Sequence, residues 1–250
     1  MTFCLGIKVD DGLVSIADTL VTAGSECSTA AKIFTYQHER QALFIMTSGL
    51  RSVRDKALTY LEEVLDESGP TFDRVFKALN AFGAQVRRVA EEDKQALVES
   101  GLEFNIHALV GGQFERDREH KLYLMYPQAN WVEVGPGTPS QIIGAAGYGK
   151  PVLDRTLKYR DPMSFALKVG CLAFDSTRIS AADVDFPIDV VLYERDSYQL
   201  VEHRYEKQDL AEISNWWQER LRRSVNELQA DWVEPLLARL PSRRGDGLSS

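Results

Sequence analysis

The sequence lacks the features of membrane, secreted and disulfide-rich proteins. Its 250 residues include three cysteines, Cys4, Cys27 and Cys171, which are odd in number and scattered. This pattern predicts reduced thiols and a cytoplasmic protein. No apolar run approaches the roughly 20 residues that span a bilayer. No basic-then-apolar leader precedes Thr2. We therefore expect neither a membrane anchor nor a secretion signal.

The chain is also short of positive charge and of histidine. Its net charge of −8 argues against nucleic acid or an anionic membrane as the main partner. The four histidines show no His-X-X-X-His spacing, and the cysteines no Cys-X-X-Cys spacing, so no zinc site is predicted. The glycine-rich stretch 144–149 lacks the Gly-Lys-Ser/Thr ending of a phosphate loop. We expect a protein that uses no metal and no cofactor.

What the chain does contain is an ordinary globular composition, with 44% hydrophobic and 26% charged residues. It shows no internal repeat and no low-complexity linker before its last residues. We predict one domain over residues 1–240, in which 209–240 form a C-terminal helix and a subunit-contact segment. Residues 241–250 are expected to form a flexible tail.

Hydrophobic periodicity predicts blocks of strands separated by helices. Asp10-Asp11-Gly12 is expected to form a hairpin turn, because Asp-Gly tolerates positive φ, and residues 23–30 to form a polar loop. The predicted strands are 2–9, 13–19, 32–36, 42–47, 104–110, 121–125, 130–134, 141–143, 188–195 and 199–206. The predicted helices are 51–67, 72–97, a short one from 151, 162–180 and 209–230. This order indicates two sheets enclosed by helix layers.

The first residues carry a candidate nucleophile. A small residue after the initiator methionine, here threonine, allows Met1 to be trimmed. Trimming would leave Thr2 with a hydroxyl and a free α-amine. An N-terminal amine titrates near about 8, so it can take the hydroxyl proton at working pH. The pattern predicts an N-terminal threonine nucleophile that uses its own amine as the base.

Three further residues supply the groups that such a nucleophile needs. Asp18 closes the second predicted strand, after a hairpin that returns it toward the chain start, and Lys32 opens the third. A lysine cation would lower the pKa of the hydroxyl, and an aspartate would hold the cation. Gly49 precedes a helix, where a backbone N–H suits an oxyanion.

Each candidate also has an ordinary structural interpretation. Asp18 could cap a turn, Lys32 could be a solvated strand-edge lysine, and Gly49 could relieve a tight strand–helix junction. Cys4, on the same strand face as Thr2 by the period of two, is expected in the core rather than as a thiol nucleophile.

Taken together, these motifs resemble proteasome β-subunits, and most of all their bacterial relative Anbu, the ancestral β-subunit. In chain order they are Thr-X-X-X-Gly at 2–6, Asp-Gly at 11–12, Ala-Asp-Thr at 17–19, Lys-Ile-Phe at 32–34 and Ser-Gly at 48–49. Segments 147–155, 174–177 and 187–196 resemble Anbu as well.

The resemblance implies a fold, a chemistry and an assembly. The fold would be a four-layer αββα sandwich of the N-terminal-nucleophile type. Thr2 would be nucleophile and base, Lys32 would lower the hydroxyl pKa, Asp18 would orient Lys32, and the Gly49 N–H would bind the oxyanion. The subunits would form open, lock-washer-like rings or helical homo-oligomers, with a peptide or protein as substrate.

Two positions depart from the proteasome pattern. A serine that lies near the threonine amine in proteasomes aligns with Ala145 or Ala146, and the second support motif reads Ser180-Ala181-Ala182-Asp183. A carboxylate near the amine would raise its pKa and keep it protonated. The first hypothesis is therefore a threonine peptidase. The alternatives are a proteasome-like scaffold with little peptidase activity, and an amide ligase or transferase partner.

The end of the chain predicts a subunit contact. The expected C-terminal helix carries Leu210, Ile213, Trp217, Leu221 and Leu228 at helical steps, and apolar residues continue through 232–240. Because an exposed apolar patch of that size is unusual on a monomer, we expect 232–240 to pack against a neighbouring subunit.

Overall fold

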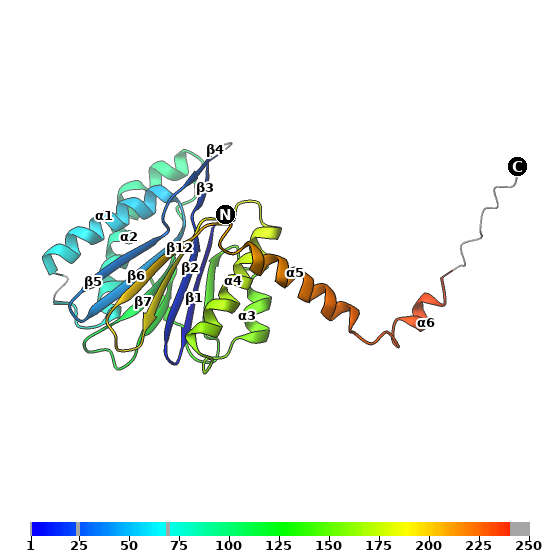
Figure 1. Cartoon of the computed structure of the whole chain (residues 1–250). Coiled ribbons are helices and arrows are strands. Elements are labelled where there is room, and N and C mark those ends of the chain that lie inside the picture. The colour runs from blue at the N-terminus through cyan, green and yellow to red at the C-terminus, as the bar shows by residue number, and fades with distance from the viewer. Residues whose placement is uncertain (1, 24–25, 69–70, 241–250) are drawn as a thin grey trace, which may run out of the picture. The chain divides into compact units, whose positions relative to one another are not determined.

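Two five-stranded antiparallel sheets and their covering helices form the larger part of the molecule (Figure 1). The computed structural model describes residues 2–23, 26–68 and 71–240. The chain divides into two compact units, one ending at Ala211 and one beginning at Glu212, and each is described by itself. The prediction of a single domain over 1–240 stays a prediction, and the predicted tail 241–250 lies outside the described residues.

The first sheet contains the start of the chain at its centre. Its strand order is β10 (Ser140–Gly144), β1 (Phe3–Val9), β2 (Gly12–Asp18), β11 (Ile188–Glu194) and β12 (Leu200–Tyr205). One face packs against the helices α3 (Lys150–Thr156) and α4 (Met163–Ser180). In this apolar layer the rings of Phe3 and Phe174 meet edge to face, with centroids 5.8 Å apart.

The second sheet is built in the same way. Its strand order is β5 (Ile33–His38), β6 (Gln41–Gly49), β7 (Ile106–Phe114), β8 (Lys121–Met125) and β9 (Trp131–Glu133). The helices α1 (Arg51–Ser68) and α2 (Val75–Glu99) cover one face. Both helices bury one apolar stripe, which includes Leu61 and Phe82, as the periodicity predicted.

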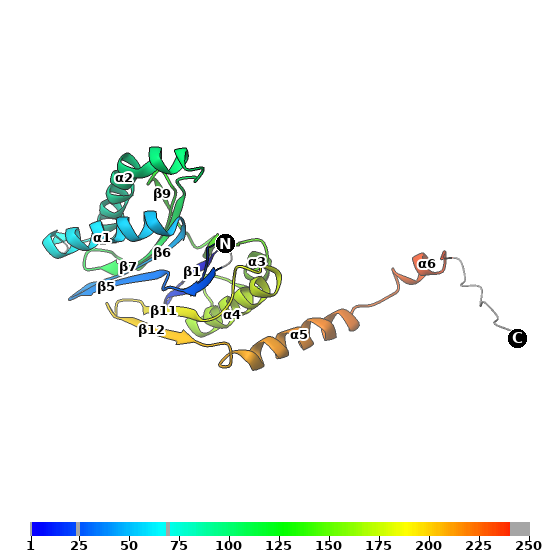
Figure 2. The same ribbon diagram turned by 90° about the horizontal axis from the view of Figure 1, so that it is seen from above.

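A third apolar layer joins the two sheets. Leu43 and Ile45 of β6 pack with α1 and α2, whereas Phe44 between them packs with residues of the other sheet. This alternation follows from the two-residue period of a strand. Figure 2 shows the resulting order: α1 and α2, one sheet, the other sheet, then α3 and α4.

Cys4 belongs to the layer between the sheets and not to an exposed reactive site. Its thiol is fully buried and donates a weak hydrogen bond to the Thr47 carbonyl at 3.7 Å. Burial raises the pKa of this thiol far above its ordinary value, so a thiolate is disfavoured.

The polar loop predicted at 23–30 is wrong in part, because these residues belong to a two-stranded ribbon. Strands β3 (Leu20–Ala23) and β4 (Glu26–Thr29) pair antiparallel. Each strand has four residues and shows no apolar alternation, so the pattern carried no strand signal.

Gly12 is needed for a different reason from the one predicted. It is the first residue of β2 and pairs with Val9, so the loop itself is Asp10-Asp11. A Cβ at Gly12 would overlap the carbonyl oxygen of Tyr193 on β11. Glycine therefore allows two strands to approach closely, and no positive φ is involved.

The second unit contains helices α5 (Ala211–Asn226) and α6 (Glu234–Leu237). Helix α5 is shorter at its C-terminal end than the predicted 209–230, and it buries none of its side chains. Pro235 lies in the first turn of α6, where its missing N–H leaves no helical hydrogen bond unmade. Among the described residues no helix has the length and apolarity needed to cross a bilayer.

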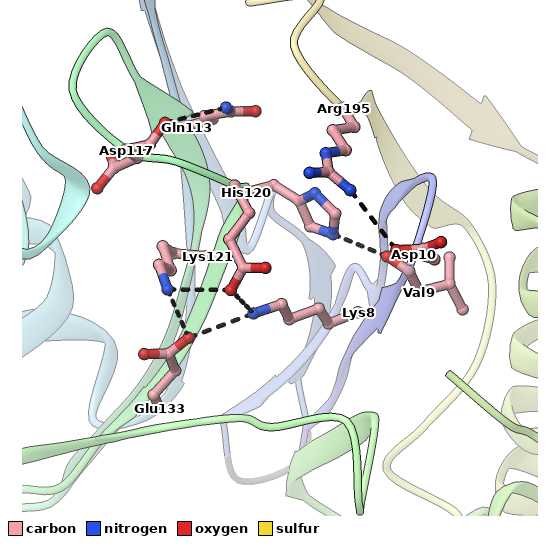
Figure 3. A network of polar contacts seen from close by, with 10 residues as sticks. Lys8, Val9, Asp10, Gln113, Asp117, His120, Lys121, Glu133 and Arg195 are labelled. Atoms are coloured by element: carbon pink, nitrogen blue, oxygen red, sulfur yellow. Dashed lines mark hydrogen bonds and ion pairs between the residues drawn. The ribbon is translucent and has the colours of Figure 1, made fainter. Parts of the chain in front are cut away.

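A polar network closes the sheet interface at the end of β1 remote from Thr2 (Figure 3). Lys8 is buried and lies 3.2 Å from both Glu119 and Glu133, and Lys121 contacts the same two carboxylates at 3.1 and 2.9 Å. A buried ammonium is tolerated because two carboxylates compensate it.

Beside this network His120 is fully buried in its neutral form. Its Nε2 donates to the Val9 carbonyl at 2.7 Å, while its Nδ1 has no hydrogen-bond partner among the described residues. Burial lowers the pKa of His120. Protonation would therefore place an uncompensated N–H in the core.

This arrangement predicts a loss of stability in acid. The unfolded chain takes up the His120 proton below about pH 6.5, whereas the folded chain resists it. The free energy of unfolding should fall from pH 7 to 5.5, by at most about 1.4 kcal/mol per pH unit for this group. His120→Gln keeps a hydrogen-bond donor to Val9, and it should make the thermal midpoint depend less on pH over that range. The matched control, His203→Gln at an exposed position, should leave the pH dependence of the midpoint unchanged. Equal slopes in the two variants would contradict this account.

Candidate active site

Asp18 is the buried centre of the candidate site. Its Oδ1 accepts hydrogen bonds from the Lys32 ammonium at 2.8 Å and from the Phe3 amide at 2.8 Å. Lys32 also donates to the Leu20 carbonyl at 2.6 Å. The structure thus brings together the predicted cation, its predicted carboxylate partner and the backbone next to Thr2.

The strand register explains why Asp18 is available for this role. Strand β2 pairs with β1 on one side and with β11 on the other, where Ile188 is opposite Asp18. The carboxylate is completely buried as a result. It lies beside the chain start because the hairpin returns β2 antiparallel to β1.

The electrostatics of Asp18 depend on its cation. Burial raises the pKa of the carboxyl group, and the charge and hydrogen bond of Lys32 act against that rise. Its Oδ2 has no hydrogen-bond partner among the described residues. The ion pair with Lys32 is therefore the main interaction that keeps a charged Asp18 acceptable in the core.

Three of the four predicted catalytic residues border one cleft of about 880 Å³. They are Thr2, Lys32 and Gly49, and Asp18 lies behind Lys32. The remaining lining residues are Leu20, Val21, Ser28, Thr47, Ser48, Leu50, Arg51, Ser52, Arg54, Asn105, Ile106, His107 and Gly144. Polar hydroxyl, amide and guanidinium groups thus surround Thr2.

The backbone of Thr2 is held on both sides. Its carbonyl accepts a hydrogen bond from the Ala145 amide at 2.7 Å, and the next amide, that of Phe3, binds Asp18. Gly144 has φ +89, and a Cβ there would overlap the Thr2 carbonyl oxygen. This close contact explains why the first residue of the 144–149 stretch is glycine.

Gly49 has a structural reason to be glycine and also borders the cleft. Its φ is +133, and a Cβ would overlap the Asn105 carbonyl oxygen. Leu50 donates to the same carbonyl at 2.9 Å, at the point where β6 ends and α1 begins. The predicted backbone relief is therefore present, and Gly49 also borders the cleft that holds Thr2.

The two predicted support residues lie at the end of α4 and in the turn that follows it. Ser180 ends α4, and Asp183 follows in the turn where the Val184 amide donates to the Ala181 carbonyl at 3.1 Å. Neither residue is among those found to line the cleft within the described part of the chain. Their supporting role stays a prediction.

Sequence reasoning missed several residues of the cleft. Thr47 and Ser48 directly precede Gly49 on β6, and Arg51 and Arg54 lie one helical turn apart at the start of α1. Their position beside Gly49 and their i, i+3 spacing were the available signals. Across residues 2–23, 26–68 and 71–240, no group of three metal-ligating side chains is found.

The close packing of Gly144 against Thr2 can be tested by adding one methyl group. Gly144→Ala should destabilise the fold by about 2 kcal/mol, because it combines a positive φ with a backbone overlap. A change of that size lowers the thermal midpoint by roughly 5 °C in a chain of this length. Gly147→Ala is the matched control, since its Cβ would meet open space. An unchanged midpoint for Gly144→Ala would show that the Thr2 backbone is not held as described.

Solved structures of several bacterial proteins share this fold. Anbu (ancestral beta-subunit) from Yersinia bercovieri matches with a TM-score of 0.85 and 26% identity over 91% of this chain and 98% of its own. The Gly-1 mutant of Anbu from Hyphomicrobium sp. strain MC1 has a TM-score of 0.84 and 28% identity, and the match covers 91% and 99% of the two chains. The helical assembly of the Anbu complex from Pseudomonas aeruginosa has a TM-score of 0.83 and 28% identity over 91% and 97%.

No protein-family model and no curated protein matches the chain. The structural matches nevertheless cover 91% of this chain and nearly the whole of each Anbu chain. The resemblance to Anbu predicted from the motifs is therefore confirmed.

Proposed function

We propose that this chain is a proteasome-like N-terminal-threonine peptidase that works as a self-assembled homo-oligomer in the cytoplasm. Its two sheets and two helix layers would be the αββα sandwich of N-terminal-nucleophile hydrolases. The observation that carries the proposal is the Asp18 carboxylate, which binds both Lys32 and the Phe3 amide. That carboxylate fixes a cation and the start of β1 in one place.

The chemistry follows from the groups around the cleft. After Met1 removal, the Thr2 amine takes the proton of the Thr2 hydroxyl, and Lys32 stabilises the developing alkoxide. The oxygen attacks a peptide carbonyl, whose oxyanion receives a hydrogen bond from the Gly49 N–H. The leaving amine takes a proton from the Thr2 ammonium, and water then releases the acyl group from Thr2.

A second candidate is a proteasome-like scaffold with little peptidase activity. One observation favours it: the residue whose amide donates to the Thr2 carbonyl is Ala145, and its side chain is a buried methyl group. A hydroxyl that could assist proton transfer at the amine is absent from that residue. Intact-mass measurement with a threonine-directed electrophile separates the two candidates, because a scaffold would gain no adduct.

The proposal predicts complete removal of Met1 in freshly purified native protein. It also predicts one covalent adduct with a peptide epoxyketone, because that electrophile bonds to an N-terminal threonine. Intact mass should show the parent chain minus methionine and then plus one inhibitor. Thr2→Ala should gain no adduct, and Thr2→Ser should retain part of the labelling rate. Retained Met1, or equal labelling of Thr2→Ala, would refute the peptidase.

The Asp18–Lys32 pair gives a prediction that separates stability from chemistry. Removing Lys32 alone leaves Asp18 buried without its cation, so Lys32→Ala should cost about 3–5 kcal/mol. The paired change of Asp18→Asn with Lys32→Met removes both charges and should recover most of that loss. Thermal midpoints measure the recovery, and labelling at Thr2 should stay absent in both variants. Labelling of the paired variant at the parent rate would show that Lys32 acts only in the fold.

We also propose that the second unit makes subunit contacts. Trp232, Leu236, Leu237 and Leu240 are more than half exposed within this chain. Burying apolar surface contributes about 25 cal/mol per Å² before ordering costs. A head-to-tail contact repeats that gain at every subunit, and its rotation decides between a ring and a helix.

Truncation tests this assembly. A chain ending at Ala230 should be a monomer or small oligomer by light scattering while it keeps native circular dichroism. A chain ending at Leu240 is the control and should form the full assembly, because it loses only residues 241–250. Full-sized particles from the shorter chain would place the subunit contacts on other elements.

A further inference from the structure

The cleft beside Thr2 is electropositive on an acidic protein. Its described lining contains Lys32, Arg51 and Arg54 but no aspartate or glutamate, although the chain carries a net charge of −8. Helix α1 begins at this wall and has no acidic residue in its first turn. Its N-terminal end therefore adds positive potential to that of the arginines.

The two arginines are anchored and not fully neutralised. Arg54 has a side chain that is 12% exposed, and it donates to the Ala31 carbonyl at 3.2 Å and to Asp55 at 2.8 Å. Arg51 uses its Nε to bind Asp55 at 3.2 Å. Within the described chain its two terminal nitrogens have no protein partner. One carboxylate thus serves two guanidinium groups, and a net positive charge remains at the wall.

Thr47 forms a polar part of the same wall. It is 3% exposed and borders the cleft. Its hydroxyl oxygen is itself enclosed and has no hydrogen-bond partner among the described residues, so the arginines are the groups that can contact a ligand. Arginine forks bind carboxylates bidentately.

We propose that Arg51 and Arg54 select a peptide that places a carboxylate in the cleft beside the bond attacked by Thr2. This inference rests on the proposed function, since the carboxylate is assigned to the substrate of that site. The carboxylate has two sources, an acidic side chain next to the scissile bond or the free C-terminus of a short peptide. A neutral amide in the same place would leave the guanidinium charge uncompensated.

Binding to the full-length Thr2→Ala chain tests the inference without chemistry. Four fluorescent tripeptides differ only at the last residue: Glu-amide, Gln-amide, Lys-amide, and Gln with a free carboxylate. Anisotropy should show at least one carboxylate peptide binding about tenfold more tightly than Gln-amide, with a smaller difference at high salt. The peptide that shows the preference identifies the source of the carboxylate. Equal affinities within about twofold, or tightest binding of Lys-amide, would overturn the inference.

Variants locate the selectivity. Arg51→Gln should reduce the preference about threefold, and Arg51→Gln with Arg54→Gln should reduce it below about twofold. Arg87→Gln on α2 has the same charge change on a residue outside the cleft lining, and it should keep the full preference. If the double variant does not fold, Arg51→Gln alone still decides, because that side chain is exposed and makes no buried contact. A preference unchanged in Arg51→Gln would refute the role of the wall.

Covalent labelling of the chain with native Thr2 by epoxyketones separates this inference from the proposed function. Epoxyketones that end in Glu should label Thr2 about tenfold faster than those that end in Gln, if the side chain is the source. If the binding assay identifies the side chain as the source, equal labelling by both would leave the peptidase intact and overturn the selectivity. A carboxylate preference in binding with no labelling by any probe would support the selectivity and refute the peptidase.

Discussion

The contact between Asp18 and Lys32 is the interaction on which the site depends. A carboxylate with no exposed surface needs a compensating cation, and Lys32 provides it at 2.8 Å. The same oxygen accepts the Phe3 amide, so the ion pair also fixes the first strand. The pair therefore links the packing of the core to the candidate site, and Lys32, which is 5% exposed, is not a solvated surface lysine.

Two glycines complete the positioning of the backbone around Thr2. Gly144 and Gly49 each bring a backbone so close to a neighbour that no Cβ fits, and both border the cleft with Thr2. The Thr2 carbonyl is bound by the Ala145 amide, and the Phe3 amide by Asp18, so the strands on both sides of β1 hold the backbone at Thr2. Rigid strands and a helix start surround Thr2, which suits a pre-organised site.

The sequence predicted the parts of this arrangement that depend on spacing along one hairpin. Asp18 follows Thr2 by the length of two strands and a turn, and Lys32 opens the next long strand, so their approach could be inferred. The ribbon of β3 and β4 could not, since each strand has only four residues and neither alternates between apolar and polar residues. Arg54 and Thr47 were also missed, because their exposure to the cleft depends on how α1 and the second sheet meet, which periodicity does not encode.

The central claim is that Thr2, poised by Asp18 and Lys32, is the nucleophile, and the structure of a covalent adduct tests it most directly. The native assembly treated with a peptide epoxyketone should show the inhibitor bonded to Thr2. The adduct oxygen should lie within about 3 Å of the Gly49 nitrogen. An adduct on another residue, or an oxygen directed away from Gly49, would contradict the account.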